Sequence, residues 1–469
     1  MNGIRLRLLL AIASGALMAQ VASLTPFWPL AWIAPVPLML ASIGARGWAP
    51  LVYGAIAGAL STALAFTYFL ELAGLAPTLI IVALTALMWA LYAFATAAAA
   101  RWLPTGAAVF VLPLLVAGVE TLLAANSPHG SSGSLAYSQM DFTPVLQAAG
   151  LGGAPAVSFI VLLFASALAF VFAKRALRAA IAPFGIVIAA LAYGFMSGAP
   201  ETSGQLRVAM LAANDFDLDA DDWRPAWNAY AAAAEQAAGQ GARLIVMPEK
   251  IAALPEADAD EAQARFAAIA RQHDVTIVIG LVTSGGRARF NSAWLFTPQG
   301  FENYDKRHMV PGFEDHFTVG TSDLVAQVDG LSIGVAICKD MDFPALGRGY
   351  GARAVDVMLV PAWDFTRDAW AHSRIGMLRG VENGYAIVRS ARDGVMTVSD
   401  ARGRVLSEET AGAQVTTLIT TIPTPAHQNR LYTRIGDVFG WACLALAILL
   451  IGWMVVARVH AGQGGAKAN

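Results

Sequence analysis

The stretch RLIVMPE (243–249) decides the fold of the central part of this chain. Its apolar run Leu244–Met247 is typical of a buried strand. Pro248 cannot donate a ladder hydrogen bond, so the strand is expected to end there and to project the carboxylate of Glu249 from its carboxyl end. Sites in α/β sheets are commonly assembled at such strand ends. The stretch therefore predicts a buried strand that carries a candidate functional residue.

Strands and helices alternate on both sides of this stretch. We expect further strands at 205–214, 275–283, 291–297, 331–338, 355–363, 385–391 and 395–406, and helices at 224–242, 256–273 and 366–382. Elements in this order suit sheets covered by helices, so the sequence predicts an α/β domain. The sequence contains no P-loop, no G-x-G-x-x-G motif, no zinc-type spacing and no internal repeat.

The sequence before this domain is strongly apolar. The chain is 57% hydrophobic and 14% charged, yet residues 1–200 carry only ten of its 64 charged side chains. Because about 20 helical residues cross a bilayer core, the apolar runs predict eight crossings. They lie at about 4–22, 27–44, 49–70, 75–99, 105–124, 146–173, 178–197 and 436–457. The first could instead be a cleaved signal peptide, but no small-x-small site follows it and hydrophobic spans continue at once.

Lys and Arg are distributed unequally among the predicted loops. If the N-terminus is cytoplasmic, Arg46, Arg101 and the cluster at 174–178 all lie inside, and the outer loops before residue 146 contain no Lys or Arg. This pattern satisfies the positive-inside rule and places the α/β domain on the outer face, with both termini in the cytoplasm. The predicted parts are a transmembrane domain of about seven helices, an outer domain, a last crossing and a cytoplasmic tail (1–200, 201–432, 433–460 and 461–469).

Composition excludes several classes of function. A net charge of −2 and a pI near 6.4 provide no basic field for nucleic acid. Two cysteines exclude a disulfide framework. His308 and His316 lack a third ligand at a useful spacing, so we expect no metal site and no cofactor.

Three residues combine suitable chemistry with a suitable place in the chain. Glu249 and Cys338 each end an apolar strand, and Lys306 lies in the segment YDKRH (304–308) after a predicted strand and turn. A carboxylate can deprotonate a thiol, and an ammonium can stabilise the oxyanion that forms when a thiolate attacks an acyl group. Taken singly, the cysteine could be a small buried side chain, and the two charged residues could be solvated. Together they are a sufficient set for acyl transfer.

Longer motifs surround these three residues. They are LAYSQMDFTPVLQAAGLGGAPAVSF (135–159), LIVMPE (244–249), NSAWLF (291–296), YDKRHMVPGFED (304–315), RIGMLRGVENGYAIVRSARDGVMTVSDARGRVL (374–406) and YTRIGDVFGW (432–441). The set resembles the Glu-Lys-Cys triad of the nitrilase superfamily. With apolar helices on both sides, it resembles the membrane-bound branch, the apolipoprotein N-acyltransferase family. The resemblance implies a multi-pass helical membrane domain and an extracytoplasmic nitrilase-like αββα sandwich.

The resemblance also implies a role for each matching residue. Cys338 is expected to be the nucleophile that becomes an acyl-thioester, Glu249 the general base, and Lys306 the group that holds the oxyanion. Glu314 matches the second glutamate of the family, which positions the site; its alternative is a surface loop acid. Trp223 is matched to an aromatic residue near the lipid entrance, with core packing as the alternative.

The sequence departs from the family pattern next to the nucleophile. An aromatic residue and Glu usually follow the cysteine, whereas Lys339 and Asp340 follow Cys338 here. We expect Lys339 to lower the pKa of the thiol and Asp340 to help position the substrate. The usual Asn-Asp-Ala-Trp-Phe run is replaced by Pro361–Phe365, and SPHGSSGS (127–134) replaces a Pro-Trp segment. These changes leave the acceptor open.

Three functions therefore follow from the sequence. The first is an N-acyltransferase of the bacterial inner membrane, expected to be a monomer, that moves a fatty acyl chain from a phospholipid to an amine. In the family this amine is the N-terminal diacylglyceryl-cysteine of a lipoprotein. The second is a nitrilase-type amidase, or an acyltransferase for a different amine or lipid. The third is a binding protein that keeps the fold without catalysis.

Overall fold

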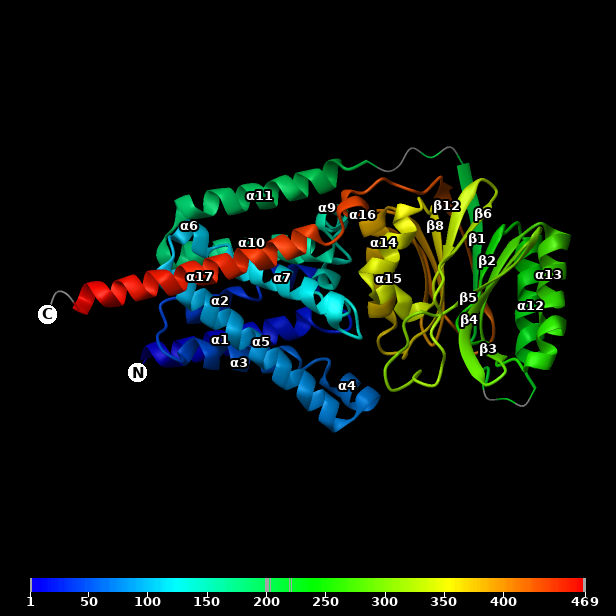
Figure 1. Ribbon diagram of the computed structural model, residues 1–469, viewed down its shortest axis with the longest axis horizontal. Helices are drawn as coiled ribbons and strands as arrows, with labels where there is room; N and C mark the ends of the chain where they lie inside the picture. The colour runs from blue at the N-terminus through cyan, green and yellow to red at the C-terminus, as the bar shows by residue number, and fades with distance from the viewer. Residues whose placement is uncertain (1, 199–201, 203, 219, 221, 467–469) are drawn as a thin grey trace. The chain divides into compact units, whose positions relative to one another are not determined.

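The computed structural model describes residues 2–198, 202, 204–218, 220 and 222–466, and it divides the chain into two compact units. The helical unit comprises Met1–Leu123, Gly133–Ser197 and Asp437–Asn469, drawn in blue to teal and in red in Figure 1. The α/β unit comprises Ala124–Ser132 and Gly198–Gly436. A short segment from within the predicted membrane region thus belongs to the α/β unit.

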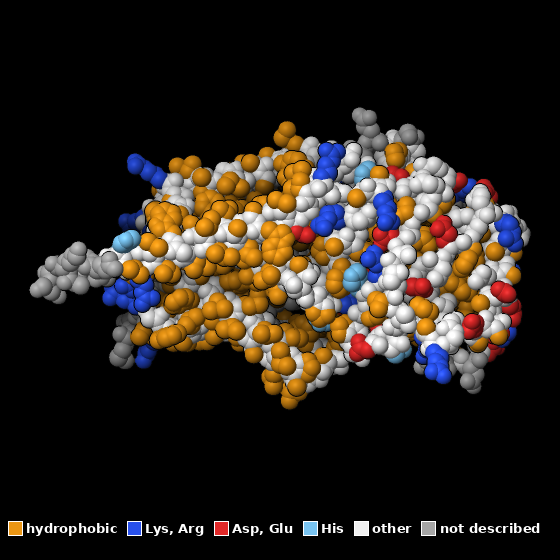
Figure 2. Space-filling view, in the orientation of Figure 1, with side chains coloured by type: hydrophobic (Ala, Val, Ile, Leu, Met, Phe, Trp, Pro, Cys, Tyr) orange, Lys and Arg blue, Asp and Glu red, His pale blue; other side chains and the backbone are white. Residues whose placement is uncertain are grey.

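The helical unit is built mainly of long apolar helices. Its elements are α1 (Asn2–Val21), η1 (Trp28–Trp32), α2 (Val36–Ser42), α3 (Ala49–Ser61), α4 (Phe66–Ala73), α5 (Leu75–Trp102), α6 (Thr105–Ala108), α7 (Val111–Asn126), η2 (Leu135–Gln139), α8 (Thr143–Leu146), α9 (Ala149–Gly152), α10 (Ala154–Lys174), α11 (Leu177–Met196) and α17 (Val438–Ala466). Within the described residues, six helical stretches are long and apolar enough to cross a membrane, or seven if the bent pair α3 and α4 counts as one span. Their outward side chains are apolar (Figure 2), as in Leu84, Ile188 and Leu449, which are each more than half exposed. Such a surface suits lipid, so the chain is a multi-pass membrane protein.

Two predicted crossings differ in the structure. The expected span at 27–44 is a 3-10 turn followed by the seven-residue helix α2, because Pro29, Pro35 and Pro37 interrupt it. The expected span at 49–70 bends by 68° between α3 and α4. The described structure therefore contains six or seven helices of crossing length, where the sequence predicted eight.

The α/β unit contains two six-stranded sheets packed face to face. Its elements are β1 (Gly204–Ala212), α12 (Arg224–Gly239), β2 (Leu244–Val246), η3 (Glu256–Asp258), α13 (Ala259–His273), β3 (Thr276–Gly285), β4 (Ala288–Thr297), β5 (Gly300–Asp305), β6 (Leu324–Val328), β7 (Leu331–Val335), η4 (Cys338–Asp342), α14 (Pro344–Ala352), β8 (Val357–Trp363), α15 (Ala369–Asn383), β9 (Ala386–Arg392), β10 (Val395–Ser399), β11 (Val405–Thr410), β12 (Thr416–Thr424) and α16 (Leu431–Ile435). The strand orders are β12-β1-β2-β3-β4-β5 and β11-β10-β9-β8-β7-β6. In each sheet the three central strands β1–β3 or β7–β9 are parallel.

Side chains alternate in direction along the strands, and this alternation explains the layers of the α/β unit. In β1, Val208 and Met210 join the core between the sheets, whereas Ala209 and Leu211 join the core under α12 and α13. Both faces of such a strand are buried, which gives the continuous apolar runs of the sequence. Helices α14 and α15 cover the second sheet (Figure 1). The unit is therefore an αββα sandwich, which confirms the expected fold class.

Candidate active site

The candidate base lies on a turn directly after β2. Glu249 is 1% exposed, and its backbone N–H donates to the carbonyl of Ala362 in the other sheet at 3.2 Å. Gly280 in β3 lies so close that a Cβ there would come within 2.5 Å of Glu249 Cα. The sequence places a glycine where the turn needs this approach. The backbone of Glu249 is thus held by main-chain contacts on both sides.

The candidate nucleophile lies on a turn after β7. Cys338 begins the 3-10 turn η4 with φ of +43°, a left-handed conformation that costs a non-glycine residue about 1–2 kcal/mol. Its partly buried thiol donates to the carbonyl oxygen of Trp363 at 3.7 Å. Strain at one residue, with its side chain directed to a specific acceptor, is typical of functional turns.

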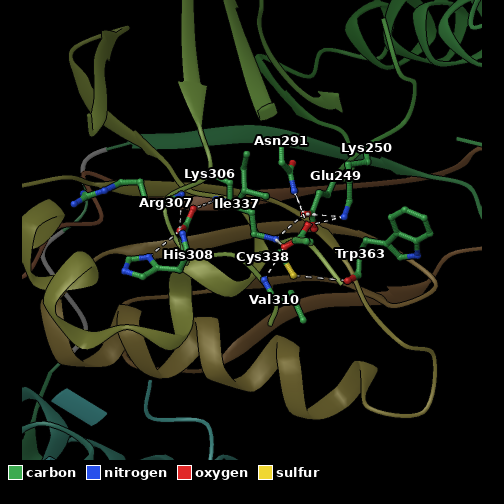
Figure 3. A network of polar contacts seen from close by, with 12 residues as sticks. Glu249, Lys250, Asn291, Lys306, Arg307, His308, Val310, Ile337, Cys338 and Trp363 are labelled. Atoms are coloured by element: carbon green, nitrogen blue, oxygen red, sulfur yellow. Dashed lines mark hydrogen bonds and ion pairs between the residues drawn. The ribbon is translucent and has the colours of Figure 1, made fainter. Parts of the chain in front are cut away.

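Lys306 connects the strand β5 to both candidate carboxylates. Its N–H donates to the carbonyl of Asn291 at 2.8 Å, which fixes the backbone directly after the strand. Its buried Nζ lies 2.8 Å from Oε1 of Glu249 and 2.7 Å from Oε2 of Glu314. Figure 3 shows Lys306, Glu249 and Cys338 close together. The structure thus brings the three predicted triad residues into one site.

Glu314 is buried in the same network and is not a surface acid. It is 2% exposed and accepts hydrogen bonds from the N–H of Val310 (2.9 Å), Nδ2 of Asn291 (2.9 Å) and Nζ of Lys250 (2.7 Å). These donors, together with Lys306, occupy both of its oxygens. The geometry gives it no free oxygen for proton transfer, so its place suits positioning.

The two oxygens of Glu249 have different surroundings. Oε1 accepts from Lys306 (2.8 Å) and from Nδ2 of Asn291 (2.5 Å). No hydrogen bond from the described residues reaches Oε2. One oxygen therefore anchors the carboxylate, and the other is available to accept the thiol proton.

Charges in the site hold each group in a definite state. Burial alone would lower the pKa of Lys306, but the carboxylates of Glu249 and Glu314, and Cys338 in its thiolate form, outweigh it and raise the pKa. Burial favours the neutral form of Glu314, but Lys306 and Lys250 outweigh it and lower the pKa to about 2. These two groups therefore remain an ammonium and a carboxylate at neutral pH.

The thiol rests in its neutral form. Burial, and then the charge of Glu249, raise the pKa of Cys338, against the opposing charges of Lys306 and Arg389. The predicted lowering of this pKa by Lys339 is wrong, because that side chain turns to Asp342 (3.2 Å). A neutral resting thiol must transfer its proton as it attacks, which requires a base at hand.

Asp340 supports the nucleophile turn from beneath. It is fully buried and accepts from Tyr304 Oη (2.7 Å), from the N–H groups of Ile337 (3.1 Å), Arg307 (3.1 Å) and His308 (2.9 Å), and from Nδ1 of His308 (3.0 Å). The carboxylate thus ties the segment that carries the lysine to the turn that carries the cysteine. Asp340 is fully buried, so its side chain has no exposed surface with which to contact a substrate. We therefore propose that Asp340 positions these two segments and not the substrate.

The structure places Trp223 elsewhere. Its ring meets Trp227 edge to face at 5.7 Å, and its Nε1 donates to Asp258 at 2.8 Å. It belongs to the core between the first sheet and helices α12 and α13. The spacing of Trp223, Trp227 and Tyr230 marks one helix face, a signal that favours packing. We propose no substrate role for it.

Two members of the network were not predicted. Asn291 donates to both glutamates, and Lys250 contacts them from the position after Glu249. The segment NSAWLF was noticed only as a motif, although an Asn that opens a buried apolar strand is a signal for a buried polar role. No signal in the sequence shows that Lys250 turns toward its neighbour.

Residues 127–132 of the SPHGSSGS stretch belong to the α/β unit. The N–H and Oγ of Ser131 both donate to the carbonyl of Asp342 at 2.9 Å, and a Cβ on Gly130 would come within 2.3 Å of the same oxygen. The segment that departs from the expected pattern therefore packs on the turn of the nucleophile.

The described residues contain no group of three or more His, Cys, Asp or Glu side chains that could hold a metal ion. His308 stacks on Phe343 with ring centroids 3.7 Å apart, and His316 contacts the ring of Phe317 at 4.2 Å. The two histidines therefore have aromatic partners.

Comparisons with known proteins cover most of the chain. A family model described as carbon-nitrogen hydrolase matches residues 207–428, and one described as apolipoprotein N-acyltransferase N-terminal domain matches 14–167. The chain is 27% identical to an apolipoprotein N-acyltransferase of Geobacter metallireducens, over 94% of each chain, and 26% identical to one of Pseudomonas putida, over 96% of each. Among solved structures, the NitN amidase from Neterenkonia sp. AN1 matches 49% of this chain and 96% of its own, with 23% identity and a TM-score of 0.42.

Proposed function

The chain belongs to the apolipoprotein N-acyltransferase family of the nitrilase superfamily, and from this premise we propose that it transfers a fatty acyl chain from a phospholipid to an amine through a thioester on Cys338. The observation that carries the proposal is the buried network in which Glu249 keeps one oxygen free of hydrogen bonds beside the thiol. The acceptor that we propose is the N-terminal amine of a lipoprotein's diacylglyceryl-cysteine, and the names of the relatives, apolipoprotein N-acyltransferase, support a lipoprotein acceptor.

In the first half-reaction Glu249 takes the thiol proton as Sγ of Cys338 attacks the ester carbonyl of the phospholipid. The carbonyl oxygen becomes an oxyanion, which the ammonium of Lys306 stabilises. The C–O bond then breaks, and the proton on Glu249 passes to the leaving alkoxide. The products are a lysophospholipid and an acyl-thioester.

In the second half-reaction an uncharged amine attacks the thioester carbonyl. Glu249 takes a proton from the attacking nitrogen, the C–S bond breaks, and the thiolate of Cys338 recovers that proton. The product is an amide, and the enzyme returns to its resting state. Water must stay out between the two steps, because hydrolysis of the thioester competes with the amine.

We propose that the protein acts as a monomer, because side chains of this chain already anchor Glu249 and satisfy Glu314. An amidase, or an acyltransferase for another amine, is the second candidate, because Pro361–Phe365 and Lys339 replace the family's usual residues. Both candidates form a thioester on Cys338. An amidase would take the acyl group from an amide and pass it to water, whereas the alternative acyltransferase would use a different amine or lipid.

Intact-mass spectrometry of the full chain with phospholipid tests this proposal. The wild type should gain the mass of one acyl chain and release lysophospholipid, and Cys338→Ser should gain none. Addition of a diacylglyceryl lipopeptide should remove the adduct and yield N-acylated peptide in equal amount. Turnover without acylated peptide would favour the second candidate, and a wild type that forms no adduct contradicts a phospholipid donor and hence the first candidate.

We further propose that the protein lies in the inner membrane with the α/β unit on the outer face and both termini in the cytoplasm. Support comes from the Lys and Arg of the predicted inner loops. Termini on one side need an even number of crossings, which the six long helices provide, or eight if the bent pair and Trp28–Ser42 each cross as well. Accessibility of tags at the two termini in intact cells tests it, and tags on opposite sides contradict it.

A further inference from the structure

A second lysine follows the base directly, and its backbone conformation is unusual. Lys250 has φ of +53°, in the left-handed region that a lysine rarely adopts. Its carbonyl accepts from Arg392 at 3.4 Å, and the next N–H, of Ile251, donates to Gly280 at 2.9 Å. Successive side chains of an extended segment point to opposite faces. The left-handed residue lets Glu249 and Lys250 reach the same network.

The ammonium of Lys250 lies between the two carboxylates of the site. Its Nζ is 2.7 Å from Oε1 of Glu314 and 3.7 Å from Oε1 of Glu249. The side chain is only 13% exposed, and it packs over the rings of Trp363 (5.1 Å) and Phe317 (5.8 Å). Figure 3 shows Lys250 beside Glu249 and near Trp363. A lysine held in this way is not a solvated surface charge.

The formal charges show what this ammonium changes. Glu249, Glu314 and Lys306 alone carry a net charge of −1 next to the thiol, and Lys250 brings the network to zero. An excess negative charge opposes both the thiolate and the oxyanion, because each adds negative charge in the same partly buried place. Without Lys250, the single ammonium of Lys306 would have to neutralise two carboxylates.

The other charges near this network do not replace Lys250. Arg389 acts on the thiol but is paired with Asp364. The guanidinium of Arg392 lies over the ring of Trp363, 4.0 Å from the ring centroid, and donates hydrogen bonds to main-chain carbonyls. Arg289 contacts the ring of Phe317 at 5.7 Å and forms no ion pair within the described residues. Among the described residues, none of the three forms a hydrogen bond or ion pair with Glu249 or Glu314, although Arg392 interacts electrostatically with Glu249.

We propose that Lys250 is a positioning residue of the acyl-transfer site, whose ammonium neutralises Glu314 so that Lys306 remains available to Glu249 and to the oxyanion. The inference rests on the proposed function, since it assigns a role within that reaction. It also predicts that Lys250 favours ionisation of the Cys338 thiol, which can be measured without any lipid.

Alkylation of Cys338 by iodoacetamide tests the inference in full-length protein that carries Cys443→Ala, so that one thiol remains. The rate is followed by intact mass between pH 6 and 10. Lys250→Met should slow alkylation about tenfold and require about one pH unit more for a given rate, because thiolate forms less readily. Lys250→Arg, which keeps the charge, should stay within about threefold of the parent. Arg289→Met removes a charge that has only the ring of Phe317 in common with Lys250, so it should leave the alkylation rate unchanged.

The double variant separates charge balance from a structural ion pair. Lys250→Met with Glu314→Gln again leaves a network of zero net charge, so it should alkylate faster than Lys250→Met alone. A purely structural pair would leave the double variant as slow as the single one, or slower. If Lys250→Met does not fold, Lys250→Gln carries the same expectation, because its amide can still donate to Glu314.

The outcomes also separate this inference from the proposed function. If the parent forms no acyl adduct from phospholipid but Lys250→Met slows alkylation, the proposed function fails and the role of Lys250 in thiol ionisation stands. If acyl adducts form and Lys250→Met alkylates like the parent at every pH, the inference on Lys250 is overturned and the proposed function stands.

Discussion

The base and the nucleophile lie on turns after central parallel strands of the two sheets, and these turns are held in different ways. Main-chain contacts hold the turn after β2, where Glu249 donates to Ala362 and Gly280 lies against it. A single buried carboxylate, Asp340, holds the turn after β7 by accepting five hydrogen bonds. The difference follows from the chemistry. The side chain of a base must keep one oxygen without a hydrogen bond, so the turn of Glu249 is held through its backbone. The strained turn at Cys338 is instead held by the strong hydrogen bonds that a buried carboxylate accepts.

The largest effect is expected from the base itself. Glu249→Gln keeps the shape of the side chain but removes proton acceptance, so formation of the acyl adduct should slow by about 10²–10⁴-fold. Rapid-quench intact mass with phospholipid measures this rate. Glu302→Gln, on an exposed position of β5, is the control and should acylate normally. Normal acylation by Glu249→Gln would remove the basis for treating the turn after β2 as the base turn.

A change in main-chain packing should disturb the base turn almost as strongly. Gly280→Ala would place a Cβ 2.5 Å from the carbonyl of Pro248 and from Glu249 Cα, and backbone atoms cannot yield cheaply. A displacement of about 1 Å at a reacting group can cost about 100-fold in rate. Gly285→Ala in the same strand meets only Phe290 at 3.8 Å, an ordinary contact, and should leave acylation unchanged. Equal rates for the two variants would contradict the main-chain explanation.

The nucleophile turn should respond to loss of a charge. Asp340→Asn keeps the size of the side chain, but its amide nitrogen cannot accept hydrogen bonds from the groups that now donate to it. We expect acylation to slow about tenfold and the protein to lose about 1–3 kcal/mol of stability. Asp342→Asn, on the same turn, gives up only the contact with Lys339 and should do less. If the two variants behave alike, the five hydrogen bonds do not distinguish Asp340.

These differences also explain what the sequence could predict. The triad was found because strand ends and residue types are readable from local pattern, and the αββα sandwich followed from resemblance. The roles of Lys250 and Asn291 depend on a left-handed turn and on strand register, which local pattern does not encode. In the helical unit the apolar runs were readable, but the prolines of Trp28–Ser42 were given too little weight. For Trp223 the sequence left a lipid-entrance role and core packing open, and the structure places the ring in the core.

The smallest effect concerns Glu314, whose network joins the two turns. Its contribution to the stability of the protein is expected to depend on pH. Its pKa is about 2 in the folded protein, because Lys306 and Lys250 outweigh the effect of burial, whereas an ordinary glutamate titrates near about 4.3. A folded-state pKa below the unfolded value stabilises the protein above about pH 4.3, and this stabilisation is lost as pH falls toward about 2. The thermal midpoint of the wild type should therefore exceed that of Glu314→Gln near pH 6, by the equivalent of roughly 1–3 kcal/mol, and the gap should narrow steadily toward pH 3. Glu302→Gln, on the exposed edge of β5, should show no such gap. A gap that stays constant with pH would mean that the ion pairs of Glu314 contribute nothing to the stability of the network that joins the turns.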